Sequence, residues 1–232
     1  LEGEKFSTSR NYALWVNETL EVVPVDLLRY YLTAISPETA DSNFSWDEYQ
    51  SKVNTELADI LGNLINRSLS FLNKNYEGKV GPEDQKIDPA VAEMMNTAVT
   101  EYCEKLDQGF SKAALVSVVD LGRKLNVYFQ EQAPWKVRKE DPIKAHQSLY
   151  SVCVASKAIA ILLYPIVPTI AQKIWQQLGF TNAIEANPFW EVNNLAFPKG
   201  HLIAKEVTPI VVKVEDDFIG TQKERLSSKI KK

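Results

Sequence analysis

Apolar positions recur with helical spacing over most of the chain. One series follows Ser45 and comprises Val53, Leu57, Ile60, Leu64 and Phe71. Intervals of three, four and seven residues place these side chains on one face of an α-helix. Ser45 and Glu48 have the spacing of a capping box, in which each side chain bonds a backbone N–H at the helix start. The pattern predicts a helix of about 30 residues that continues to about Tyr76.

Further helices are predicted by the same periodicity and by residues typical of helix ends. Asp before Pro begins two of them, and Gly or Pro closes each one. Their expected bounds are 88–107, 110–132, 141–164 and 169–178. Shorter helices are expected at 27–35 and 216–231. Short connections between helices of similar length predict an antiparallel helix bundle.

The two ends of the chain are less regular than its middle. β-favouring pieces at 12–16 and 20–23 precede the first helix. Near the other end, 201–203 and 209–212 either pair as extended pieces or pack as loops. The expected fold is therefore all-α, a helix bundle preceded by a small α/β connector. We expect a connector at 1–45, a helical domain at 46–187, and at 188–232 a tail and helix that pack back on the bundle.

Composition narrows the class of protein. The chain has 232 residues, 45% hydrophobic and 24% charged, with only 9 Gly and 11 Pro. These values exclude a disordered or fibrous protein and favour helices over a many-stranded sandwich. The stretch 149–171 is apolar with Lys157 as its one charge. Its prolines and small polar residues favour a buried bundle helix over a membrane span.

Several residues that could suggest chemistry have a simpler interpretation. Cys103 and Cys153 belong to no metal or disulfide motif, so we expect reduced thiols in the cytoplasm. His146 and His201 have no catalytic partner in sequence and are expected to be structural or exposed. The acidic run 215–217 is interpreted as a helix start, and no metal site is expected. The formal charge of −4 argues against indiscriminate nucleic-acid binding. The last ten residues carry five basic and one acidic residue, typical of a solvated tail and, less often, of a phosphate contact.

The first string with specific chemistry lies near the N-terminus. Residues 5–10 read Lys-Phe-Ser-Thr-Ser-Arg, a short basic loop with three hydroxyls. Such a loop can donate ammonium and hydroxyl groups to the oxygens of a polyphosphate. The alternative is an ordinary solvent-exposed polar terminus.

A second group of residues could bind an unpaired base. Asn63 and Arg67 are four residues apart, so their side chains share one face of the predicted long helix. An amide and a guanidinium side by side can read the edge of a splayed base. Trp135 follows Pro134 in a predicted polar loop, with Lys136, Arg138 and Lys139 close behind. A Trp beside cations can stack a base and hold its phosphate. The alternative for Asn63 and Arg67 is that they are ordinary polar residues on the surface of a bundle helix. The alternative for Trp135 is that its side chain is buried in the core.

Taken in order, these strings resemble the class I aminoacyl-tRNA synthetases, and the methionyl-tRNA synthetase family in particular. Residues 5–9 match the family's KMSKS loop at Lys5, Ser7 and Ser9, whereas Phe6 replaces its Met and Thr8 its second Lys. The segments 25–32, 41–44 and 54–67 follow the family pattern, and 61–67 matches its anticodon-reading helix. Residues 132–136, Gln-Ala-Pro-Trp-Lys, match its Pro-Trp loop. The resemblance extends from Glu4 to about Gly179.

The resemblance implies the C-terminal part of a methionine–tRNA ligase, which uses ATP and Mg²⁺ to activate methionine and transfers it to tRNA(Met). It assigns ATP phosphate contacts to Lys5, Ser7, Thr8 and Ser9. It assigns anticodon contacts to Asn63, Arg67, Asn126, Pro134 and Trp135.

Neither a Rossmann nucleotide-binding motif nor an initiator Met occurs in these residues. We therefore expect a fragment that binds tRNA, holds no ATP and is inactive alone, without its N-terminal Rossmann catalytic domain. Neither DNA nor a membrane is an expected partner. The alternatives are the anticodon-binding domain of another class I synthetase and a helical protein-interaction module, which predicts scattered basic residues and a buried Trp135.

Overall fold

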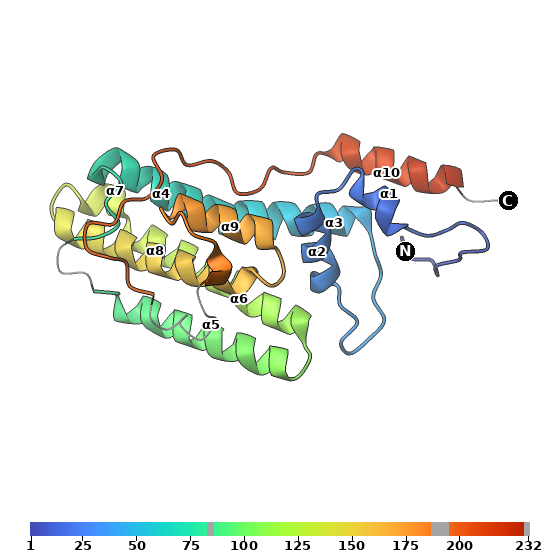
Figure 1. Ribbon diagram of the computed structural model, residues 1–232, viewed down its shortest axis with the longest axis horizontal. Coiled ribbons are helices and arrows are strands. Elements are labelled where there is room, and N and C mark those ends of the chain that lie inside the picture. The colour runs from blue at the N-terminus through green and yellow to red at the C-terminus, as the bar shows by residue number, and fades with distance from the viewer. Residues whose placement is uncertain (83–85, 187–194, 230–232) are drawn as a thin grey trace.

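The computed structural model describes residues 1–82, 86–186 and 195–229, and over these the chain is a helix bundle (Figure 1). No strand occurs in the described ranges, where pairing is limited to the isolated bridges Ser7–Tyr12 and Lys79–Leu202. The helices are α1 Val16–Leu20, α2 Val25–Ala34, α3 Trp46–Lys52, η1 Val53–Gly62, α4 Asn63–Tyr76, α5 Pro89–Asp107, α6 Ser111–Gln132, α7 Pro134–Val137, α8 Pro142–Leu163, α9 Pro168–Gln177, η2 Ile184–Ala186 and α10 Asp216–Lys229.

The predicted long helix is confirmed as a continuous run of α3, η1 and α4, which we call the long helix. Val53, Leu57 and Leu64 from its apolar series are fully buried. The middle segment η1 is a π-helix, in which backbone N–H groups bond the carbonyl five residues earlier. The helix ends at Glu77 and Gly78, both with left-handed backbone.

The predicted capping box at the start of the long helix is wrong. The side chain of Ser45 makes no capping bond. Its backbone N–H donates instead to the hydroxyl of Tyr31 at 3.0 Å, and that hydroxyl donates to Glu48 at 3.1 Å. The N–H of Trp46 donates to Glu2 at 2.7 Å. Partners from the connector therefore cap this helix, because α2 packs close enough to bring Tyr31 to its start.

The bundle encloses α8, and consecutive long helices run in opposite directions around it (Figure 1). By length and composition α8 could cross a membrane, but 89% of its most apolar window is buried inside the bundle. The prediction of a buried core helix is thus confirmed. Lys157, the one charge in the apolar stretch, lies 4.7 Å from the ring centroid of Phe180 and 5.4 Å from that of Trp175.

The connector contains the helices α1 and α2, and in its described residues 1–45 the expected β character is limited to the isolated bridge Ser7–Tyr12. Of the two pieces predicted as extended, 12–16 ends at the first residue of α1, and 20–23 comprises the last residue of α1 and a turn. Val16 is 60% exposed, and the described residues place no strand beside it. Its β-branched side chain therefore has no neighbouring strand to pack against, and the preference of Val for extended structure is not stabilised there. The buried carboxylate of Asp26 in α2 accepts the N–H of Ile170 at 2.8 Å, at the start of α9. This bond fixes the connector to the bundle.

The described part of the tail, from Leu195, returns along the long helix toward its start. Asn73 donates to the carbonyl of Ala204 at 2.9 Å, and Asn54 and the backbone of Val214 exchange two hydrogen bonds. The segment 209–212 is therefore a packed loop, whereas Leu202 bridges to Lys79.

The final helix α10 packs on α3 and ends the described chain at Lys229. Its basic side chains Lys223, Arg225 and Lys229 form ion pairs with Asp47, Glu21 and Glu18 respectively. As far as the structure describes it, the basic end of the chain therefore forms ion pairs with carboxylates of the protein itself. Residues 230–232 lie outside the described part.

The cysteines and histidines have the structural environments that were expected. Cys153 is buried and Cys103 half-buried, and both are free thiols. Burial raises the pKa of each thiol, most strongly that of Cys153. The Nε2 atoms of His146 and His201 lie 2.8 and 2.7 Å from the backbone oxygens of Lys79 and Leu178.

Candidate nucleic-acid interface

Arg67, Phe129 and Trp135 come together from α4, α6 and α7. The guanidinium carbon of Arg67 lies 5.4 Å from the ring centroid of Phe129 and 5.7 Å from that of Trp135. The two rings meet edge to face, with centroids 5.7 Å apart and planes at 73°. Phe129 is buried, Trp135 is half-buried and Arg67 is exposed.

Arg67 is held by the aromatic rings of Phe129 and Trp135 and not by hydrogen bonds from its N–H groups, as far as the described residues show. A guanidinium can rest on aromatic rings and still present its donors along its edge. No hydrogen bond or ion pair engages Arg67 within the described ranges. Its five donors are thus available to a planar acceptor such as a base edge.

The turn that carries Trp135 differs from the predicted loop. Pro134 is buried and begins the short helix α7, after Ala133 with a left-handed φ of 38°. Pro suits this first helical position because its fixed φ matches the helix and no N–H is needed there. The turn leaves Trp135 half-buried, and Lys136, Arg138 and Lys139 follow it on the surface. The side chain of Trp135 is therefore neither fully buried in the core nor fully exposed to solvent.

Asn63 lies one turn before Arg67 and is exposed. It lines a pocket of about 360 Å³ with Gly62, Asn66 and the tail residues 209–213. Asn63 and Arg67, the two side chains predicted to read the base, therefore share one helix face. Of these two, only Arg67 has a contact with the rings of Phe129 and Trp135 in the described residues.

Asn126 has a different environment from the other predicted anticodon residues. It is half-buried, and its Nδ2 atom donates to the carbonyl oxygens of Ile60 and Gly122, at 2.9 Å in both cases. Both donor hydrogens of its amide are thus used inside the protein. Only its carbonyl oxygen is left to meet a ligand.

Sequence reasoning missed Phe129, which supports both Arg67 and Trp135. Its one signal was position, because it follows Asn126 by three residues and so lies on the same face of α6. A Phe in an apolar helix stripe is ordinarily a core residue, and Phe129 is also that.

The predicted phosphate loop is a tight turn at the other end of the molecule from α7 (Figure 1). Ser7 and Tyr12 exchange two backbone hydrogen bonds, at 2.9 and 2.8 Å. The hydroxyl oxygens of Ser7 and Ser9 lie 3.3 Å apart, while Lys5 and Thr8 are exposed. The loop and the Arg67 cluster are separate candidate sites.

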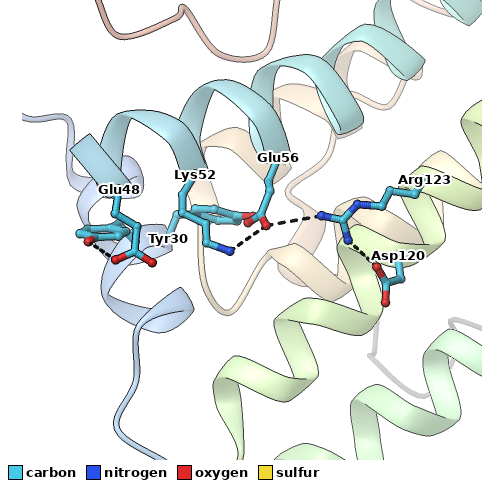
Figure 2. Close-up of polar contacts among 7 residues, drawn as sticks. Tyr30, Glu48, Lys52, Glu56, Asp120 and Arg123 are labelled. Atoms are coloured by element: carbon cyan, nitrogen blue, oxygen red, sulfur yellow. Dashed lines mark hydrogen bonds and ion pairs between the residues drawn. The ribbon is translucent and has the colours of Figure 1, made fainter. Parts of the chain in front are cut away.

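A polar cluster that the sequence did not indicate joins α2, η1 and α6 (Figure 2). Glu56 accepts hydrogen bonds from the hydroxyl of Tyr30 at 2.7 Å and the ammonium of Lys52 at 2.9 Å. Arg123, paired with Asp120, approaches Glu56 at 3.5 Å. Burial and the neighbouring carboxylate raise the pKa of the Tyr30 hydroxyl. No group of three or more potential metal-ligating side chains occurs in the described ranges.

Two family models match the chain. Residues 1–69 match "tRNA synthetases class I (M)", and residues 76–231 match "Anticodon binding domain of methionyl tRNA ligase". Among curated proteins, the methionine–tRNA ligase of Pyrococcus abyssi is 39% identical over 94% of the chain. The methionine–tRNA ligase of Methanobrevibacter smithii is 35% identical over 100% of it.

Solved structures of similar fold come from Mycobacterium tuberculosis methionyl-tRNA synthetase. Its ligand-free form has a TM-score of 0.77 and 25% identity over 85% of this chain and 40% of that one. Its complex with methionyl-adenylate has a TM-score of 0.76 and 28% identity over 90% of this chain and 41% of that one. The chain spans only 30% and 34% of the lengths of the two curated relatives above.

Proposed function

The chain belongs to the methionyl-tRNA ligase family, and from this premise we propose that it recognises the anticodon of tRNA(Met) for such an enzyme. In this proposal residues 1–45 are the catalytic loop and connector, 46–187 the anticodon-binding domain, and 188–232 a tail that returns to the connector. The complete enzyme activates methionine with ATP and transfers it to tRNA in the cytoplasm.

One observation carries the proposal. The guanidinium of Arg67 contacts Phe129 and Trp135, and its N–H groups have no hydrogen-bond partner among the described residues. In our proposal Trp135 stacks on the first anticodon base, a cytosine, while Arg67 and Asn63 bond its edge. Pro134 fixes the turn that presents Trp135. In this proposal the exposed cations Lys136 and Arg138, which follow Trp135 along the chain, contact the backbone phosphates next to the stacked base.

The loop at residues 5–9 serves a different step in the proposed enzyme. Lys5 supplies the cation, and the hydroxyls of Ser7, Thr8 and Ser9 contact the phosphates of ATP. Because Thr8 has no charge, Lys5 carries most of this role. Residues 5–10 contain no carboxylate, so they fit the phosphates and offer no ligand set for Mg²⁺. Without the Rossmann domain, we expect this chain to bind no ATP and to catalyse neither step.

A competition experiment tests the proposal. Labelled tRNA(Met) bound to the 232-residue chain is displaced by unlabelled tRNA(Met) or valine-specific tRNA, at fixed salt. We expect tRNA(Met) to compete better, because base-edge contacts discriminate whereas phosphate contacts do not. Equal or better competition by the valine-specific tRNA would contradict recognition of the tRNA(Met) anticodon by this chain. An absence of tRNA binding by the folded chain would leave a protein-interaction module.

Two variants that each remove one positive charge distinguish a contact with tRNA phosphates from an effect of the overall charge of the protein. Lys136→Ala should weaken binding of both tRNAs to the same degree and reduce the salt dependence of binding. Lys112→Ala, an exposed cation at the start of α6 and thus at its far end from Trp135, is the matched control and should leave both affinities unchanged.

A further inference from the structure

The loop proposed above to contact ATP phosphates belongs to a turn with few hydrogen bonds outside itself. Its backbone hydrogen bonds, and those of its serine hydroxyls, lie within residues 7–12. In the described chain, one hydrogen bond from residues 5–11 reaches beyond Trp15. It runs from Nδ2 of Asn11 to the backbone oxygen of Lys229, at 3.4 Å. The turn is therefore attached to α10, the helix that lies beside α1 in Figure 1.

Asn11 suits this position in two ways. Its backbone φ of 55° is left-handed, a conformation that Asn tolerates better than most residues with a side chain. Its amide is also used at both ends, because Oδ1 accepts the indole N–H of Trp15 at 3.4 Å while Nδ2 donates to Lys229. Both bonds are long, so the position of the turn depends on how firmly α10 itself is held.

Ion pairs hold α10 against the connector. The ammonium of Lys229 pairs with Glu18 on α1, and Arg225 pairs with Glu21, directly after α1, at 3.7 Å. Since α1 follows closely on the turn at 7–12, the last described turn of α10 holds both of these segments.

Apolar packing of α10 is limited by comparison. Its buried apolar residues are Ile219 and Leu226, and Phe218 meets the ring of Trp46 edge to face with centroids 6.0 Å apart. The side chains in the three ion pairs of α10 are between 27% and 67% exposed. Exposed pairs are individually weak and are screened by salt. The docking of α10 on the connector is therefore expected to weaken as the ionic strength rises.

We infer that Asn11 is a positioning residue for the activation of methionine, and that docked α10 holds the phosphate loop in place through it. The ammonium of Lys5 must meet charge that develops on the ATP phosphates, so a displaced loop loses part of this contact. The inference rests on the proposed function, because it assumes that residues 5–9 contact ATP in the complete enzyme.

Two measurements separate the position of the loop from its chemistry. Amide hydrogen exchange at residues 7–12 of the 232-residue chain reports how often the turn opens. Methionine-dependent ATP–pyrophosphate exchange by the complete enzyme reports the activation step, with kcat and the KM for ATP determined separately.

Three variants are compared with the wild type. Asn11→Asp tolerates the left-handed backbone and keeps the acceptor for Trp15, but it has no donor for Lys229. Lys229→Met keeps the backbone oxygen and removes the ion pair of the side chain, without any change of charge inside the loop. Lys213→Met is the matched control, since it removes an exposed ion pair, with Asp59 at 2.7 Å, that ties the same tail to η1.

We expect Asn11→Asp and Lys229→Met to speed amide exchange at 7–12 several-fold, and Lys213→Met to keep the wild-type rate. In the complete enzyme, Lys229→Met should reduce the kcat of ATP–pyrophosphate exchange several-fold and leave tRNA affinity unchanged. Added salt should narrow the difference between the wild type and Lys229→Met in both measurements, because it screens the ion pair that the variant lacks.

Two results would overturn the inference. A wild-type rate of amide exchange at 7–12 in folded Asn11→Asp shows that the bond to Lys229 does not hold the turn. Faster amide exchange in Lys229→Met with an unchanged kcat shows that the loop moves without consequence for activation.

Lys5→Ala distinguishes these results from a failure of the proposed function. If Lys5→Ala slows ATP–pyrophosphate exchange in either case, the phosphate role of the loop stands and only the positioning role of Asn11 is lost. If Lys5→Ala has no effect, the proposed role of the loop fails, and the inference fails with it.

Discussion

At the residue scale, Arg67 combines an exposed charge with a fixed position. The neighbouring rings of Phe129 and Trp135 restrict its guanidinium, so less side-chain entropy is lost when it binds a base. The sequence could indicate Arg67 and Trp135, because helical spacing and neighbouring cations are local signals. It could not indicate that they touch, since the contact depends on Phe129 and on the packing of α6 against α4.

The first prediction concerns the stacking surface. Trp135→Ala should weaken tRNA binding about 5- to 150-fold, equivalent to about 1–3 kcal/mol for one stacked base. The loss should be the same for matched and changed anticodons, because stacking does not depend on base identity. Trp135→Phe keeps an aromatic face and should recover part of the affinity. Binding titrations together with far-UV circular dichroism provide the measurement.

The same measurements identify the alternative role of Trp135 as a core residue. If Trp135→Ala unfolds the bundle while tRNA affinity per folded molecule is unchanged, Trp135 is a core residue. The helical protein-interaction module would then be favoured.

His146 gives the protein a pH-dependent contribution to stability. It stacks on Tyr76 with centroids 4.1 Å apart and lies 2.8 Å from the Lys79 carbonyl oxygen. Burial, with the nearby charge of Lys79, lowers its pKa below the ordinary value of 6.5, although the bond to the Lys79 carbonyl opposes this. The unfolded chain therefore binds a proton more readily than the folded chain between the two pKa values.

We expect the free energy of unfolding to decrease as the pH falls below about 6.5, where the unfolded His146 becomes protonated. His146→Gln should remove that component of the pH dependence, because an amide does not titrate. Chemical denaturation of both proteins between pH 7.5 and 5.5 checks this. Identical slopes for the two proteins would exclude a contribution from His146.

At the element scale, helix ends show what local sequence can and cannot specify. Asp88 and Asp141 cap α5 and α8 with their own side chains, at 2.9 Å in both helices, and both starts were predicted. The start of α3 was also placed correctly, but its caps come from Tyr31 and Glu2, far along the chain. The start of α6 is capped by Glu38 in the same manner. Tertiary caps and π-helical winding depend on packing and leave no local signature.

Two helix-ending glycines allow a matched test of such packing. Gly109 and Gly179 both have left-handed backbone, with φ of 80° and 91°. Nothing lies within 4 Å of a Cβ at Gly109, whereas one at Gly179 would overlap the carbonyl oxygen of Leu202. Gly109→Ala should cost about 1–2 kcal/mol from backbone conformation alone. Gly179→Ala should cost about 1–3 kcal/mol more, because the tail must move.

Equilibrium unfolding in urea measures both glycine variants. Equal losses of stability would mean that the tail at Leu202 does not hold its position against Gly179.

At the scale of the whole molecule, the bundle separates two candidate sites by its full length (Figure 1). The loop with Lys5 belongs to the connector, and Arg67 and Trp135 lie where α4, α6 and α7 meet. Asp26 fixes the connector to α9, and the tail links the end of α4 to α3. Sequence periodicity predicted α2, the long helix, α5, α6, α8, α9 and α10 in their observed order, whereas it predicted neither the helical connector nor the return path of the tail. Both depend on contacts between residues more than 100 positions apart.

The most direct test of anticodon recognition is the binding preference of wild-type protein and Arg67→Ala for two tRNA(Met) transcripts that differ only in the first anticodon base. The wild-type chain should prefer cytosine over uracil, and Arg67→Ala should reduce that preference by about 1–3 kcal/mol, as expected for a base-edge contact, with an unchanged melting temperature. An undiminished preference in the folded Arg67→Ala variant would contradict the account, because Arg67 would then read no base.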